Sequence, residues 1–273
     1  MLFQITNKCL MGCPHCMDNS TPDGGMMDFD TFRKALAFAK DNGEAHIMIS
    51  GGEPTEHPEL VDFCEEIDKT HLRFSIASNG MWLGDAIKEQ RIERIAYLRG
   101  YLGGQVYSNS KWYRLHDEIS KRYEESKGKW NFLGWCFDTT DIRSMSDIGR
   151  ARTNDMARAE CYASKYHNMC LTACVTAAQV NTIHDFFHLM LMQHKFCTPM
   201  VDYKGDIHMS ESCLCPSIGC NVKTHTYEQI WGAMKVFRPC GGCTPCRRFM
   251  VEQTPKMVAA RELLGMVKDP MGF

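Results

Sequence analysis

The stretch ITNKCLMGCPHCMDNS (residues 5–20) places three cysteines, Cys9, Cys13 and Cys16, within eight residues. It directly follows the apolar run LFQIT (2–6), which favours a β-strand. Loops at the C-terminal ends of parallel strands carry the active sites of α/β sheets and barrels. We therefore expect this loop to form a metal centre at the end of the first strand.

Composition limits the class of protein. The chain has 273 residues, 44% hydrophobic content and a net charge of -2, which predicts a folded core and no basic field for nucleic acid. No signal-peptide pattern and no apolar run of membrane-spanning length occurs in the sequence. We expect a cytoplasmic protein without nucleic-acid or membrane partners. In that reducing compartment, clusters among its 15 cysteines indicate metal ligands rather than disulfides.

Strand and helix patterns alternate along the first half of the chain. Apolar helical spacing recurs over 27–43, 60–67, 92–98 and 112–123, with Asp28 or Asp30 as the N-cap and Gly43 as the stop of the first helix. This alternation predicts an α/β fold with a parallel sheet, open or closed as a barrel. Runs that favour strands are LFQIT (2–6), HIMIS (46–50), RFSIAS (73–78), GQVYS (104–108) and NFLGWCF (131–137).

The alternation fades near residue 156, where the chain becomes rich in cysteine. One clear helical pattern remains, TYEQIWGAMKVF (226–237). We expect an α/β core over 1–155, a linking region over 156–196 and a small metal-binding domain over 197–273. Cys64 and Cys136 lie in apolar surroundings of the first part and are expected to be core residues.

The number of clustered thiols distinguishes two kinds of metal site. Three thiolates in one loop without a fourth suit a [4Fe-4S] cluster that leaves one iron open for chemistry. The alternative is a zinc loop completed by His15 or by a distant cysteine.

A second motif ends the second predicted strand, at Gly51-Gly52-Glu53-Pro54. Two residues without a Cβ let a ligand approach the backbone, and the adjacent carboxylate suits an amine. The spacing Cys-x3-Cys-x2-Cys after the first strand, combined with Gly-Gly-Glu-Pro after the second, resembles the radical S-adenosylmethionine (SAM) superfamily. The resemblance implies a partial (β/α)6 TIM-like barrel.

The resemblance also implies cofactors and site residues. Cys9, Cys13 and Cys16 would hold the cluster, SAM would chelate its open iron, and Gly51, Gly52 and Glu53 would bind the methionine amine. Further SAM contacts are implied for His15, whose backbone would face the adenine, and for Ser78, Asn79, Ser108 and Arg150. Ser108 lacks the acidic neighbour common in the family, and Arg150 is equally consistent with a surface arginine. No further catalytic residue is identified.

The C-terminal cysteines resemble the auxiliary-cluster extension called SPASM or, in its shorter form, twitch. A Gly205-Asp206 segment resembles the hairpin of that extension, and one auxiliary [4Fe-4S] cluster is implied. A zinc site is the alternative, and Cys161, Cys170 and Cys174 are expected to be buried thiols. The candidate ligands are Cys197, Cys213, Cys215, Cys220, Cys240, Cys243 and Cys246.

The function implied is reductive cleavage of SAM to a 5′-deoxyadenosyl radical that abstracts a substrate hydrogen, with flavodoxin or ferredoxin as electron donor. A peptide or protein substrate, with a separate peptide-recognition protein as a further partner, is the first hypothesis. A small metabolite or nucleoside is the second. A non-catalytic iron-sulfur or zinc protein is the third, and it leaves Gly51, Gly52 and Glu53 unexplained.

Overall fold

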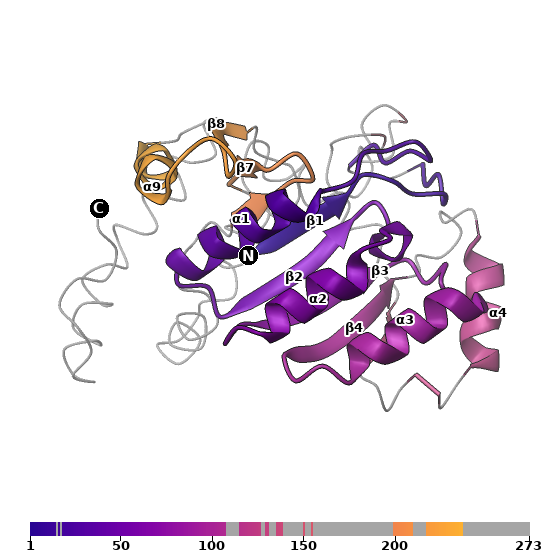
Figure 1. Cartoon of the computed structure of the whole chain (residues 1–273). Coiled ribbons are helices and arrows are strands. Elements are labelled where there is room, and N and C mark those ends of the chain that lie inside the picture. Colours follow the sequence, from indigo (N-terminus) through magenta and orange to yellow (C-terminus); the bar gives the residue numbers. More distant parts are fainter. Residues whose placement is uncertain are drawn as a thin grey trace, which may run out of the picture.

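The computed structural model of the chain describes a parallel sheet with helices on it, and a C-terminal extension of the same sheet (Figure 1). None of the helices in these described parts is long and apolar enough to span a membrane. The described residues are 1–14, 16, 18–107, 115–126, 129–130, 135–138, 150, 154, 199–209 and 217–236.

Five parallel strands form the first part of the sheet, in the order β5-β4-β3-β2-β1. Because successive parallel neighbours require crossover connections, this order confirms the predicted α/β class. The strands are β1 (Leu2–Thr6), β2 (His46–Gly51), β3 (Arg73–Ser78), β4 (Tyr101–Tyr107) and β5 (Trp135–Asp138).

Three helices lie side by side across one face of this sheet, and a fourth lies at the β4 end (Figure 1). The first helix begins as predicted, since the Asp28 carboxylate accepts a hydrogen bond of 2.8 Å from the Thr31 backbone N–H. It ends before Gly43, whose φ of 70° suits a residue without a side chain. The helices are α1 (Phe29–Asp41), α2 (Leu60–Asp68), α3 (Ala86–Ala96) and α4 (His116–Glu125).

The core between the helices and the sheet is aromatic at its centre. The rings of Phe32 and Phe63 stack with centroids 4.1 Å apart, and Phe3 meets Phe32 edge-on at 5.8 Å. Cys64 is fully buried on the same helix as Phe63, which confirms its predicted place in the core. The side chain of Cys136 lies outside the described part of the structure. This packing fixes β1 and β2, whose ends carry the two motifs.

Three C-terminal strands extend the sheet beyond β1. These are β6 (Met200–Val201), which pairs parallel with β1, and β7 (Asp206–His208) and β8 (Ser217–Asn221), which continue antiparallel. The predicted hairpin at Gly205-Asp206 is present between β6 and β7. Its turn is fixed by the Asp202 carboxylate, which accepts hydrogen bonds of 2.9 Å from the N–H groups of Lys204 and Asp206.

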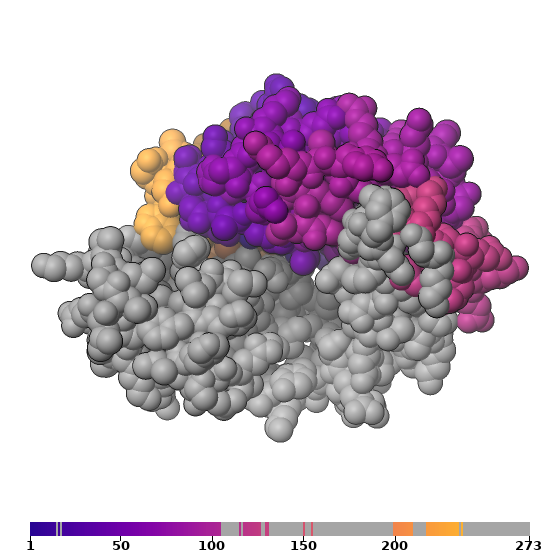
Figure 2. All heavy atoms as spheres, turned by 90° about the horizontal axis from the view of Figure 1, so that it is seen from below, coloured from indigo at the N-terminus to yellow at the C-terminus, as the bar shows by residue number. Residues whose placement is uncertain are grey.

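Helix α9 (Tyr227–Val236) follows β8 and confirms the C-terminal helix predicted from periodicity. It lies beside the N-terminal elements, at the end opposite to α4 (Figure 2). Tyr227 meets Phe38 of α1 with ring centroids 6.1 Å apart. The C-terminal strands and helix therefore pack directly on the first part of the chain. The predicted boundaries at 155/156 and 196/197 lie outside the described residues and stay predictions.

Candidate functional site

Three chain segments meet at the C-terminal ends of β1, β2 and β3. The Gly52 N–H donates to the Thr6 carbonyl at 2.8 Å, and the Glu53 N–H donates to the Lys8 carbonyl at 2.9 Å. These bonds continue the β1–β2 pairing past the strands themselves. They hold the start of the cysteine loop against the Gly-Gly-Glu-Pro segment.

The two glycines of that segment are required by contact with the chain itself. A Cβ on Gly51 would lie 2.4 Å from the Thr6 carbonyl oxygen, and one on Gly52 would lie 2.4 Å from the Lys8 carbonyl oxygen. Gly51 also has a φ of 155°, at the limit of the region that side chains avoid. The neighbouring backbone occupies the space that a Cβ would need, and the approach of a ligand to this segment stays a prediction.

The cysteine loop brings its three thiols into one region. Cys9 and Cys13 are 7% and 9% exposed, and Cys16 is half-buried against the same core. The loop closes on itself through bonds from Cys16 N–H to the Cys13 carbonyl (3.2 Å) and from Cys9 N–H to the Thr21 carbonyl (2.9 Å). All three side chains therefore lie at the end of β1, where the motif spacing predicts them.

Electrostatics in the loop disfavour free thiolates. Burial raises the pKa of Cys9 to about 11 and that of Cys13 to about 12. For Cys13, the neighbouring Cys9 and Cys16 raise the pKa further, and the Arg150 charge lowers it. At neutral pH the two buried thiols are protonated without metal, so metal binding must displace protons here.

The thiol arrangement also bears on which metal group fits. Within the described part of the chain, no three His, Cys, Asp or Glu side chains lie close enough to hold one metal ion. Zinc needs its ligands at about 2.0 to 2.3 Å from a single centre, whereas a cubane distributes its thiolates over several irons. Three thiols from one loop suit a cluster with one iron left open. The zinc alternative through His15 lies outside the described residues.

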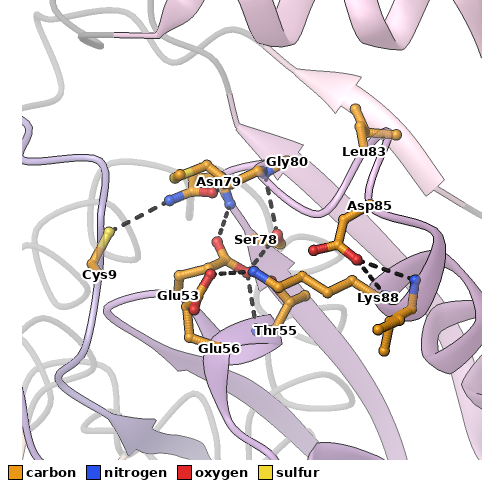
Figure 3. Close-up of polar contacts among 12 residues, drawn as sticks. Cys9, Glu53, Thr55, Glu56, Ser78, Asn79, Gly80, Leu83, Asp85 and Lys88 are labelled. Carbon is orange, nitrogen blue, oxygen red and sulfur yellow. Dashed lines mark hydrogen bonds and ion pairs between the residues drawn. The ribbon is translucent and has the colours of Figure 1, made fainter. Parts of the chain in front are cut away.

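Glu53 is the most enclosed polar residue of the site, with 0% exposure. Its Oε1 accepts hydrogen bonds from the Thr55 N–H (3.1 Å), the Thr55 hydroxyl (2.7 Å) and the Ser78 hydroxyl (2.8 Å) (Figure 3). Its Oε2 accepts one from the Asn79 N–H at 2.7 Å. Burial raises the pKa of the Glu53 carboxyl, and these four bonds oppose that rise. Oε2 is the oxygen with the greater capacity left for another donor.

Thr55 was not singled out from the sequence, although it donates two of these four bonds. It lies in the short 3-10 helix η1 (Pro54–Glu56), for which the Glu53 carboxylate serves as N-cap. The signal was present, because an acidic residue followed by Pro is typical of a helix start. The Glu53 carboxylate therefore both caps η1 and belongs to the candidate site.

Asn79 connects Glu53 to the cysteine loop. Its side-chain oxygen accepts a bond of 3.0 Å from the Met81 N–H, which directs the amide nitrogen toward the Cys9 sulfur at 3.5 Å (Figure 3). Its backbone N–H is the donor to Glu53 Oε2. Residues predicted separately at the ends of three strands thus form one connected hydrogen-bond network.

Arg150 lies against the cysteine loop, bonded to main-chain carbonyls. Its Nε donates to the Cys13 carbonyl at 2.9 Å and its NH1 to the Ser20 carbonyl at 2.6 Å. These partners are main-chain groups, and contact between Arg150 and SAM stays a prediction. Asn154, which was not singled out from the sequence, bonds the same loop through the Pro14 carbonyl at 2.8 Å.

Other expected site residues lie largely outside the described parts. These include His15 and Ser108, the buried-thiol candidates Cys161, Cys170 and Cys174, and every auxiliary-ligand candidate except Cys220. Cys220 lies on β8, is 6% exposed and has a pKa raised by burial. The undescribed ones are Cys197, Cys213, Cys215, Cys240, Cys243 and Cys246.

Comparison with known proteins shows what the first part of the chain is similar to. Residues 3–125 match the model of the Radical SAM superfamily. The tungsten-containing aldehyde ferredoxin oxidoreductase cofactor-modifying protein of Pyrococcus furiosus is 32% identical over 96 residues, which cover 34% of this chain and 27% of that protein. The PqqA peptide cyclase of Ruegeria pomeroyi is 31% identical over 88 residues, which cover 32% of this chain and 24% of that protein. The matched segments thus span about a quarter of these relatives.

The fold is also shared with a solved structure. Streptococcus suis SuiB bound to its precursor peptide SuiA superimposes with a TM-score of 0.56 over 87% of this chain and 66% of that chain, at 14% identity. At that identity the likeness concerns the fold alone. It confirms the predicted α/β partial-barrel architecture, with C-terminal antiparallel strands joined to the parallel sheet.

Proposed function

We propose that this chain, whose residues 3–125 match the radical SAM superfamily, generates a radical to modify a peptide or protein side chain. The cluster and SAM, when bound, supply the reductive cleavage that yields methionine and a 5′-deoxyadenosyl radical for hydrogen abstraction. The observation that carries the proposal is the network joining Cys9, Asn79 and Glu53 across the ends of β1, β3 and β2.

Each side chain has a proposed task in that reaction. Cys9, Cys13 and Cys16 ligate the cluster, and Glu53 Oε2 accepts the methionine ammonium of SAM. Because Glu53 has no exposed surface, the atoms covering Oε2 must move apart when the ammonium binds. Gly51 and Gly52 hold the carboxylate beside the loop through the backbone. Ser78 and Asn79 orient the same carboxylate, while His15, Ser108 and Arg150 remain the other proposed SAM contacts.

The substrate class is supported by relatives. The Ruegeria pomeroyi protein is named as a peptide cyclase, and the Streptococcus suis structure contains a precursor peptide. We propose a peptide or protein substrate for this chain, a flavodoxin or ferredoxin as electron donor, and a separate peptide-recognition protein as a further partner. An auxiliary [4Fe-4S] cluster bound by a subset of the C-terminal cysteines would complete the cofactor set.

A small metabolite or nucleoside is the second candidate substrate. The observation in its favour is the Pyrococcus furiosus relative, which is named as a cofactor-modifying protein. A non-catalytic metal protein explains the site less well, because it gives no task to the buried Glu53 carboxylate beside the thiols.

The substrate class is tested by incubating the anaerobically reconstituted protein with SAM, a reductant, and separate pools of candidate peptides and metabolites. We expect 5′-deoxyadenosine formation to rise with peptides and to stay at its basal rate with metabolites. A rise with metabolites or nucleosides alone would replace the first candidate by the second. No 5′-deoxyadenosine under any condition, in protein with a full cluster, would contradict radical SAM chemistry.

The Glu53→Gln substitution tests the carboxylate. An amide offers one acceptor oxygen, so one of the two backbone N–H donors, Thr55 or Asn79, would face an N–H group. We expect the free energy of unfolding to fall by about 1 to 3 kcal/mol and SAM binding to weaken by about 1.5 to 3 kcal/mol. Urea unfolding of the metal-free protein and equilibrium SAM binding measure the two effects separately.

The matched control is Glu56→Gln in the same short helix. Glu56 pairs with the Lys88 ammonium, for which an amide oxygen is still an acceptor, and a change below about 1 kcal/mol in either quantity is expected. Wild-type SAM affinity in the Glu53 variant would remove this carboxylate from the proposed SAM site.

A further inference from the structure

Two residues that follow the cysteine loop by more than one hundred positions, Arg150 and Asn154, donate hydrogen bonds to its backbone. Arg150 donates its backbone N–H to the Cys16 carbonyl at 2.9 Å, in addition to the side-chain bonds from Nε to Cys13 and from NH1 to Ser20. Asn154 adds the bond to the Pro14 carbonyl. Four hydrogen bonds thus run from two residues to four carbonyls between positions 13 and 20.

Arg150 and Asn154 are held in register with each other. The Asn154 N–H donates to the Arg150 carbonyl at 2.8 Å, a bond between residues four positions apart. A guanidinium offers its donors in a fixed planar fork, so two of them can hold two carbonyls at a set separation. We call Arg150 and Asn154 the loop brace.

The bonds of the loop brace reach the part of the loop that contains Cys13 and Cys16. Gly12 has a φ of 64° and Asn19 a φ of 52°, so the backbone turns sharply on both sides of Cys13 and Cys16. Among the described residues, Cys13 and Cys16 bond each other locally, whereas Cys9 is tied to the Thr21 carbonyl. The loop brace therefore fixes the two thiols that lie farther from β1.

Arg150 also carries a positive charge to within hydrogen-bond distance of the Cys13 backbone. A cation near an iron-sulfur cluster favours the state with one more electron, and cluster potentials respond to net charge and hydrogen bonding. The guanidinium therefore has two separable effects. One is mechanical, on the loop, and the other is electrostatic, on the electron that the cluster receives.

We propose that the loop brace holds Cys13 and Cys16 in the cluster-binding conformation and that the Arg150 charge raises the reduction potential of the SAM cluster. This inference rests on the proposed function in that it assumes a cluster on the three cysteines. Arg150 acts in it as a positioning residue, through main-chain carbonyls.

The test separates charge from hydrogen bonding with three variants. Arg150→Lys keeps the charge and loses the fork, Arg150→Gln loses both, and Asn154→Ala removes one neutral bond. Arg122→Lys is the matched control, because Arg122 also donates to a main-chain carbonyl, that of Leu83 at 2.9 Å, far from the loop in sequence. Each protein is reconstituted anaerobically, and its folding is checked by circular dichroism.

Two measurements that need no turnover are made on each protein. The first is the rate at which bathophenanthroline disulfonate removes iron, after subtraction of the rate in a Cys9, Cys13 and Cys16 triple alanine variant. The second is the midpoint potential of the SAM cluster from a reductive titration followed by electron paramagnetic resonance, with that cluster identified by its response to added SAM.

We expect iron loss about tenfold faster in both Arg150 variants and about threefold faster in Asn154→Ala, with Arg122→Lys at the wild-type rate. The potential should become more negative in Arg150→Gln and stay at the wild-type value in Arg150→Lys. Wild-type rates of iron loss in the Arg150 variants would overturn the mechanical part of the proposal. A wild-type potential in Arg150→Gln would overturn the electrostatic part.

These outcomes are distinguishable from failure of the proposed function. Wild-type protein that holds the cluster but makes no 5′-deoxyadenosine would contradict the function and leave both readouts valid. If Arg150→Gln does not fold, Arg150→Lys and Asn154→Ala still decide the mechanical part. Arg150→Met, with a similar stem and no charge, then decides the electrostatic part.

Discussion

Replacing Cys9, Cys13 and Cys16 by alanine should remove about four irons per chain and abolish SAM cleavage. The three thiols lie together at the end of β1, and without them no cysteine remains in residues 5–20 to hold the cluster. The measurement is iron and sulfide content after anaerobic reconstitution, with 5′-deoxyadenosine formed in the presence of dithionite. Wild-type protein should hold more than four irons per chain, the remainder belonging to the auxiliary site.

Cys64→Ala is the matched control for that result. Cys64 is fully buried in α2 and is not part of the cysteine loop, so its loss should lower stability slightly and leave iron content and SAM cleavage unchanged. If the triple variant keeps its full iron, the loop is not the cluster site. Zinc in place of iron in wild-type protein prepared anaerobically would contradict the proposed function as a whole.

The second large effect is expected from Gly52→Ala. The added Cβ would lie 2.4 Å from the Lys8 carbonyl oxygen and 2.7 Å from its carbon, so the backbone itself must shift. That shift would break the bonds from Gly52 to Thr6 and from Glu53 to Lys8. We expect a loss of about 3 kcal/mol or more in the free energy of unfolding, measured by urea denaturation of the metal-free protein.

The comparison variant is Gly232→Ala in α9. No heavy atom lies within 4 Å of the Cβ that it would add, and alanine is favoured over glycine inside a helix. We expect a gain of about 0.4 to 1 kcal/mol. The Gly52 variant should unfold at a lower urea concentration than the Gly232 variant. If the two midpoints were equal, the end of β2 would be able to adjust to the added Cβ, and the expected loss of stability would be wrong.

Local pattern was sufficient to predict much of the first half of the fold. The strands at 2–6 and 73–78 were predicted with the bounds that the structure has, and Asp28 caps α1 as expected. The fourth strand begins at Tyr101, earlier than predicted. The prediction missed its start because Gly103 and Gly104 interrupt the residues that favour a strand. Helix α3 ends at Ala96, although the apolar spacing continued to Leu98. The ends of strands and helices depend on backbone hydrogen bonds, which the spacing of apolar residues in the sequence does not reveal.

The site was predictable to the extent that motifs mark it. Cys9, Glu53 and Asn79 were selected because each follows a strand, and parallel strands end at one edge. Their mutual bonds were not predictable, because a side chain's partner depends on three-dimensional packing. The close contact between Gly52 and Lys8 was not predictable for the same reason, since sequence shows that a Cβ is missing but not which atom takes its place. Arg150 and Asn154 reach the loop over a long sequence separation that no local pattern encodes.

The pairing of β6 with β1 bears on the order in which the chain folds. Leu2 and Phe3 pair with Met200 and Val201, so the start of β1 lacks this strand partner until residue 200 has been synthesised. Ile5, by contrast, already accepts a bond from the nearby Met27 N–H. The strands from β1 to β4 can pair earlier, through neighbours close in sequence. During that interval the start of β1 presents an unpaired, apolar edge, the type of surface that recruits other chains and leads to aggregation. Synthesis that pauses before residue 200 should therefore increase the demand for chaperones, and the short β6 would act as the cap that ends this vulnerable period.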